Sequence, residues 1–177
     1  VKYYGDIKSS ADNALKENAI LQRLISNPLE TGAGVPIAGA AANWAAFAGL
    51  GGDKVKEYAT NSQNFTRDTM ELVMNRQLAQ KGPQTESDAK RLESTVANAK
   101  NTKAANAAIA QFALAQNKRL IEQRKFYDKW WIDKKTYEGA DDAWFDGRGG
   151  TSVWDDVPGG GAQPGALPDG VSVKRVR

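Results

Sequence analysis

Small side chains occupy most of the apolar positions of this chain, and this limits the kind of core that the chain can build. The 177 residues include 27 Ala but only 33 Leu, Ile, Val and Phe together. Such a low share of large apolar residues indicates disorder only when the net charge is also high, and here the net charge is +3. We therefore expect an ordered, all-α protein, elongated and oligomeric, whose long helices meet through thin, Ala-rich contacts.

The chain contains neither Cys nor His. It therefore lacks a disulfide framework, thiolate and imidazole metal ligands, and the Cys-His and Ser-His-Asp groups of nucleophilic catalysis. The sequence predicts a protein that is not an enzyme, with no catalytic residues, no metal site and no cofactor. A carboxylate-based hydrolase is the least favoured alternative, because no pair of acidic residues defines a cleft.

Apolar spacings of three and four residues predict the first two long helices. One covers residues 9–27, with Ser10 as the N-cap and Asn27-Pro28 as the stop signal. The other covers residues 53–81, and Lys81-Gly82-Pro83 ends it. Its apolar seam repeats every seven residues, at Tyr58, Phe65, Leu72 and Ala79.

A further helix is predicted to start at Thr85 and to break near residue 100, where Asn101-Thr102 offers a new N-cap. The last helix then covers about residues 103–136. Its main apolar stripe consists of Ile109, Phe112, Ala113, Leu120, Tyr127, Trp130 and Trp131. A second apolar line, Leu114, Ile121 and Ile132, projects about 120° away. Either a third helix of the same chain or a neighbouring subunit covers this line, which makes it a candidate oligomer interface.

Two more segments are candidates for binding. A basic line on the last helix, Lys118, Lys125 and Lys129 with Arg119 and Arg124 beside it, is either a solvated face or a contact with nucleic-acid phosphates. Residues 31–52 carry no charge and hold six Gly and eight Ala. This segment is either a small-residue packing helix or a membrane contact, made through Ile37, Trp44, Phe47 and Leu50.

The sequence beyond residue 137 changes character. It carries acidic residues and two of the five Trp, followed by Gly-Arg-Gly-Gly and by Pro/Gly-rich linker sequence. We expect one short helical turn near 139–146, an acidic segment that folds back near Lys134-Lys135, and a Trp cluster that holds the tail on the last helix. The chain thus divides into an N-terminal helical segment (1–30), an uncharged segment (31–52), a long helical hairpin (53–137) and a tail (138–177).

Two stretches resemble proteins of tailed-bacteriophage particles. Residues 80–92 resemble the "LKG-x-x-T-D-x-[DE]-x-x-L" turn and helix start, and residues 126–144 resemble the "F-x-x-x-W … G-[AS]-x-x-A-W" element of internal virion, DNA-transfer and tail-associated proteins. The resemblance covers roughly residues 53–157. Ser87 stands where such proteins sometimes carry an acidic residue.

The resemblance implies a structural virion protein that oligomerises and helps to deliver the genome across the host envelope. Its implied partners are further copies of itself, portal or tail proteins, double-stranded DNA and the host membrane. Its implied location is the virion and, after ejection, the host cell envelope. Two alternatives remain: a fixed tail, hub or head-to-tail connecting component, or the non-catalytic C-terminal region of a virion cell-wall hydrolase.

Overall fold

Helices account for nearly all of the regular structure in the computed structural model. The structure describes residues 2–32, 38, 39, 41–43, 45, 52–79 and 96–158. No strand occurs within these ranges, which confirms the all-α prediction. The elements are α1 (Lys2–Ser26), α3 (Asp53–Ala79), α5 (Lys103–Lys134), α6 (Ala140–Asp146) and two short 3₁₀ helices, η1 (Arg148–Gly150) and η2 (Val153–Asp156).

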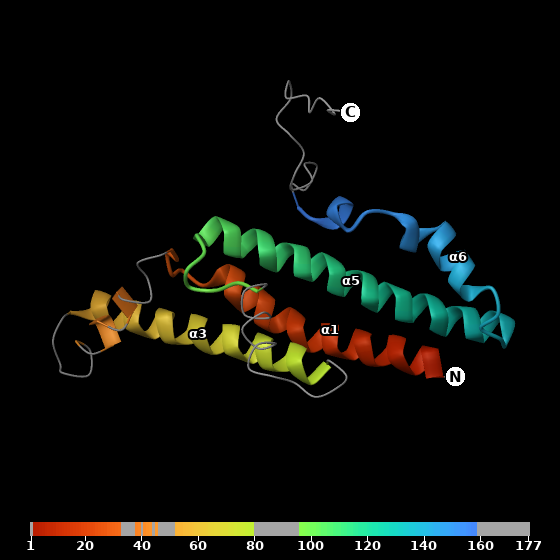
Figure 1. Cartoon of the computed structure of the whole chain (residues 1–177), viewed down its shortest axis with the longest axis horizontal. Helices are drawn as coiled ribbons and strands as arrows, with labels where there is room; N and C mark the ends of the chain where they lie inside the picture. Colours follow the sequence, from red (N-terminus) through yellow and green to blue (C-terminus); the bar gives the residue numbers. More distant parts are fainter. Residues whose placement is uncertain are drawn as a thin grey trace, which may run out of the picture.

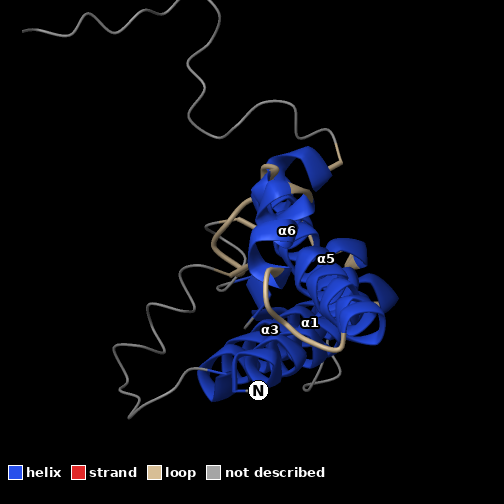
Figure 2. Ribbon diagram, turned by 90° about the vertical axis from the view of Figure 1, so that its right-hand side faces the viewer, coloured by secondary structure: helices blue, strands red, loops and turns tan. Residues whose placement is uncertain are grey.

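The three long helices lie side by side and form an elongated bundle, with α1 in the middle (Figure 1). Helix α1 packs against both α5 and α3 and runs in the opposite direction to each of them. After α5 the chain turns back, and α6 lies along the side of α5 that faces away from α3 (Figure 2). The chain thus supplies a third long helix and a returning segment to cover the faces of α5.

Helix α1 begins at Lys2, so the predicted start at residue 9 with Ser10 as N-cap is wrong. Tertiary contacts explain the extension: Ile7 is buried beside Tyr127 of α5, and the ring of Tyr4 packs on the same cluster. The helix ends at Ser26, as the Asn27-Pro28 signal predicted. There the Asn27 side chain accepts a hydrogen bond from the Leu29 amide at 2.9 Å.

The principal core joins all three long helices. Ile20, Leu21 and Leu24 of α1 are buried against Phe65 and Leu72 of α3. The predicted seam is therefore confirmed at Tyr58, Phe65 and Leu72, while the side chain of Ala79 lies outside the described residues. Helix α5 contributes only Ala110 and Ala113 as fully buried core residues here, so the contact is as thin as the composition predicted.

Helix α5 begins and ends close to the predicted boundaries. Thr102 is its N-cap, and the hydroxyl accepts a hydrogen bond from the Ala105 amide. Asn98 and Asn106 then brace the turn that precedes the helix, since the Asn106 side chain bonds both the amide and the carbonyl of Asn98. The helix stops at Lys134, and Lys135 follows in the left-handed conformation with φ 58°.

Several predictions fall on parts of the chain that the structure does not describe. These are the helix start at Thr85 and the four proposed membrane-contacting residues Ile37, Trp44, Phe47 and Leu50. Among the described residues, no helix has the length and apolar character needed to cross a membrane. Within the uncharged segment, Asn43 accepts a hydrogen bond from the Gln63 side chain of α3 at 3.0 Å.

Candidate functional site

The returning segment after α5, residues 140–157, is called the C-terminal arm below. Its first half is anchored by Trp144, which is buried and whose ring centroid lies 5.5 Å from that of Phe126 on α5. Ala140 is fully buried in the same cluster, beside Tyr127. Its second half is anchored by Trp154, whose ring lies 4.4 Å from that of Phe112. Tryptophans therefore do hold the tail on the last helix, but at two separate places rather than as one Trp cluster: Trp144 packs with Phe126 and Trp130, and Trp154 packs on Phe112.

An ionic cluster fixes the end of the arm. The Asp156 carboxylate, only 10% exposed, pairs with Arg119 at 2.9 Å and with Arg148 at 2.7 Å. Arg148 also reaches Glu122 of α5 at 2.7 Å. Hydrogen bonding from Arg148, joined by that from Arg119, lowers the pKa of Asp156 and keeps it ionised. Sparsely hydrated charges are stable only when they are paired in this way, so the cluster specifies where the arm docks.

The acidic segment does fold back onto α5, but not where the sequence predicted. Asp156 pairs with Arg119, with Arg148 and, at 3.9 Å, with Lys118. Asp141 accepts a hydrogen bond from the hydroxyl of Tyr127. Lys134 and Lys135, the predicted partners, are exposed. The reason is the turn after Lys134. It carries the acidic residues back along a face of α5 other than the one that carries Lys134.

Two glycines of η1, Gly149 and Gly150, are required by close packing rather than by linker flexibility. A Cβ on Gly149 would lie 2.5 Å from the indole nitrogen and 3.0 Å from the carbonyl oxygen of Trp144. A Cβ on Gly150 would lie 2.4 Å from the carbonyl oxygen of Phe145. The Gly-Arg-Gly-Gly sequence is therefore part of the packed arm.

Tyrosines join the start of α1 to the end of α5. The Tyr4 hydroxyl donates a hydrogen bond to Asp128, and its ring stacks on Tyr137 at 5.1 Å. The bond to Asp128, together with burial, raises the pKa of Tyr4 to about 12. Burial first, and then the bond to Asp141, raises the pKa of Tyr127. Both phenols are therefore neutral structural groups at physiological pH.

The basic line on α5 is only partly available to a ligand. Arg119 is 12% exposed and bound to Asp156, and Arg124 pairs with Asp12 at 2.5 Å and with Asp128 at 3.7 Å. Neither arginine is an open phosphate contact. Lys118 lies 3.8 Å from Glu122 and Lys129 lies 3.1 Å from Asp133, but both extend into solvent. Lys125 is exposed and has no partner in the described part of the chain.

The second apolar line of α5 does not form one open stripe. Leu114 packs against the principal core, and Ile121 is half-buried. Only Ile132, at 65% exposed, projects into solvent, beside the exposed ring of Trp131. The candidate oligomer interface is thus reduced to the C-terminal end of the helix.

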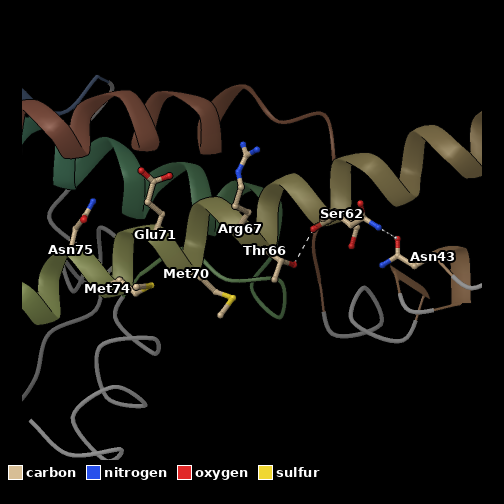
Figure 3. Close-up of a pocket in the computed structure, with 9 residues that line it drawn as sticks. Asn43, Ser62, Thr66, Arg67, Met70, Glu71, Met74 and Asn75 are labelled. Carbon is tan, nitrogen blue, oxygen red and sulfur yellow. Dashed lines mark hydrogen bonds between the residues drawn. The ribbon is translucent and has the colours of Figure 1, made fainter.

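The largest described groove lies on the outer face of α3, opposite the face that packs on α1 (Figure 3). It has a volume of about 690 Å³ and is closed at one end by Asn43. Met70 and Met74 point away from α1 into this groove and are 61% and 58% exposed. Amide, hydroxyl and thioether groups make up most of the lining, which suits contact with another surface. The remaining lining residues are Ser62, Gln63, Thr66, Arg67, Glu71 and Asn75.

This groove was not predicted from the sequence, although the sequence contains a signal for it. Met70 and Met74 are the only two methionines of the chain. They lie one helical turn apart and on the face opposite the Phe65–Leu72 seam.

In the described ranges, no group of three or more acidic residues is placed to hold a metal ion. Comparison with protein-family models, with curated proteins and with solved structures finds no match to this chain.

Proposed function

We propose that this chain is a non-catalytic structural protein of a tailed-bacteriophage particle, which self-assembles and helps to deliver the genome across the host envelope. The observation that carries the proposal is the exposure of flexible apolar side chains on two outer surfaces. Met70 and Met74 line the groove on α3, and Trp131 and Ile132 project at the end of α5. Clustered exposed apolar side chains are typical of protein–protein contact surfaces, and methionine adapts to varied partners.

The link to phage particles rests on the sequence resemblance. The structure gives physical roles to residues of its second stretch, 126–144, whereas the first stretch, 80–92, lies outside the described residues. Phe126 and Trp130 are the α5 part of the aromatic cluster, and Trp144 completes it from the arm. Gly139 takes a positive φ of 75° at the turn, and Ala140 is too buried for a larger side chain. The matched residues of this stretch thus build one packing unit, which gives the resemblance a structural basis at residues 126–144.

Contact with DNA is part of this proposal in a narrower form than the sequence suggested. Lys118, Lys125 and Lys129 point outward along one side of α5 and can face phosphates in a closed assembly. Arg119 and Arg124 are left out, because their ion-paired side chains are only 12% and 29% exposed. Lys118 and Lys129 also pair with carboxylates of the same chain, but they remain 60% and 78% exposed. Membrane contact through residues 31–52 rests on the composition of that segment alone.

The experiment that tests the proposal compares intact phage particles with particles emptied by triggered genome release. Mass spectrometry reports the abundance of this chain in each preparation. We expect the chain in intact particles and its loss from the emptied ones. Retention would overturn the role in ejection and identify a fixed tail or connector component, and absence from both preparations would overturn the virion assignment.

A second measurement addresses self-assembly of the purified protein. Light scattering over a range of concentrations, with and without anionic liposomes, reports the mass of the particles formed. We expect a defined oligomer that lipid or DNA promotes. A strict monomer under all of these conditions would contradict a conduit role.

A further inference from the structure

The C-terminal arm is a compact unit that docks mainly along one side of α5. Its first half also meets the start of α1, where Ile7 shares a cluster with Ala140 and Trp144. Its contacts with α5 are made by Trp144 on Phe126, Trp154 on Phe112 and Asp156 on Arg119. These three contacts follow one stripe of α5, in which residues 112, 119 and 126 are seven apart. Nothing in these contacts requires that the arm and the helix belong to the same chain.

The connection between α5 and the arm is short and strained. Residues 135–139, called the hinge below, must reverse the chain direction. Lys135 adopts φ 58° and is the one non-glycine residue with a positive φ among those described, and Gly139 adopts φ 75°. A side chain in the left-handed region costs free energy that an extended hinge would release. Short hinges under strain favour the exchange of the segment that they connect.

We propose that the C-terminal arm exchanges between two copies of this chain, so that each arm docks on the α5 of its partner. Exchange replaces every contact between arm and helix with an identical one, so these contacts do not oppose it. Opening of the hinge removes the left-handed conformation at Lys135. The closed form is held by Tyr137, which stacks on Tyr4 at 5.1 Å and on Trp131 at 5.0 Å. Because exchange joins two chains, the exchanged fraction depends on protein concentration.

This inference rests on the proposed function in one respect. That function requires self-assembly, and arm exchange names a contact through which the subunits would be linked. An arm that crosses to the next subunit gives the Trp154 and Asp156 contacts a role in assembly. The partner is a second copy of this chain, recognised by the same aromatic and ionic groups that dock the arm within one chain.

The absence of native Cys permits a direct test on the full chain. One variant carries Gln116→Cys on α5 and another carries Val153→Cys on the arm, two positions that line a common pocket. The two variants are mixed, incubated under mildly destabilising conditions and treated with a short bis-maleimide. We expect a cross-linked heterodimer that grows with protein concentration. A matched control pairs Val153→Cys with Thr60→Cys, which is exposed on α3, and should give no heterodimer.

Two hinge variants test whether strain in the hinge favours exchange of the arm. Gly139→Ala adds a Cβ that meets only ordinary contact, 3.7 Å from the ring of Trp130, yet strains the positive φ. It should increase the heterodimer fraction by roughly fivefold or more. Lys135→Gly relieves the strain in the closed hinge and should decrease the fraction by a similar factor.

The outcomes separate this inference from the proposed function. Oligomers seen by light scattering without the cross-linked heterodimer would overturn arm exchange and leave self-assembly through another surface standing. A monomer at every concentration would overturn both. Equal heterodimer fractions in the two hinge variants would also overturn the inference, because hinge strain would then have no part in exchange.

Discussion

Asp156 and Arg119 are 37 positions apart in the sequence and form an ion pair at 2.9 Å, with both side chains nearly excluded from solvent. The pair joins η2, the last turn of the arm, to the middle of α5. Arg119 also donates hydrogen bonds to the carbonyls of Thr151 and Ser152. One guanidinium on the helix therefore organises the whole end of the arm.

Replacement of Asp156 should release this end. Asp156→Asn leaves Arg119 and Arg148 without their shared carboxylate, and we expect a loss of about 2 kcal/mol in the free energy of unfolding. Urea unfolding followed by circular dichroism measures the change. Asp155→Asn, at an exposed neighbouring position, is the control and should leave stability within about 0.5 kcal/mol of the parent.

Acid should detach the arm for the same reason. The pKa of Asp156 is lowered in the folded protein, chiefly by hydrogen bonding from Arg148. Its stabilising contribution is therefore complete above the ordinary carboxyl pKa near 3.8 and is lost as the pH falls through the lower folded value. Limited proteolysis should cut the arm more readily below about pH 4. In Asp156→Asn, the rate at which the arm is cleaved should no longer show the increase caused by protonation of Asp156.

Alkali should weaken the contact between α1 and α5. The pKa of Tyr4 is about 12 in the folded protein, against 10.0 ordinarily, so the folded state retains a proton that the unfolded state loses. This stability is complete below pH 10 and declines as the pH rises toward 12. Tyr4→Phe should flatten the dependence of the unfolding free energy on pH in this window.

The two glycine positions with the most different surroundings should respond with opposite signs. Gly149→Ala forces a Cβ against the indole and carbonyl of Trp144 and should destabilise the arm by about 1–3 kcal/mol. Gly5→Ala lies within α1 with no atom in the way and should stabilise the protein by about 0.5–1 kcal/mol. Thermal unfolding of both variants measures the difference, and equal effects would contradict the described packing of Gly149.

The groove on α3 should matter for assembly rather than for folding. The double variant Met70→Gln, Met74→Gln keeps the helix and removes exposed apolar surface. We expect self-association to weaken by about tenfold or more, since an important contact residue contributes more than about 1 kcal/mol. Sedimentation measures the association constant. Leu15→Gln, at an exposed apolar residue of α1, is the matched control, and an equal effect there would remove the groove from the assembly contact.

Local sequence signals predicted the long helices well. The Thr102 cap, the end of α1 at Asn27-Pro28 and the seven-residue seam of α3 all depend on residues close together in the chain. The start of α1 was missed because it depends on Tyr4 and Ile7 meeting the far end of α5. No local pattern reports a contact across more than 100 residues.

The docking of the arm could be predicted only in outline. Trp residues and acidic residues indicated a tail that returns to the last helix, but not that Arg119 would be its anchor. The spacing of Phe112, Arg119 and Phe126 was readable as a stripe. Arg119, the charged member of this stripe, made it look like part of a solvated face. Its partner Asp156 could not be predicted, because Asp156 follows several glycines whose conformation depends on packing.

The arm also determines where Pro158, the last described residue, lies relative to α5. Trp154 is held beside Phe112, near the start of α5, whereas the turn into the arm follows Lys134 at its other end. These two points on the helix are about 33 Å apart, at 1.5 Å per residue. Docking of the arm therefore holds Pro158 near the first third of α5, and an arm released at the hinge would carry this residue away from that position by up to a distance of this order or more, depending on the angle of opening.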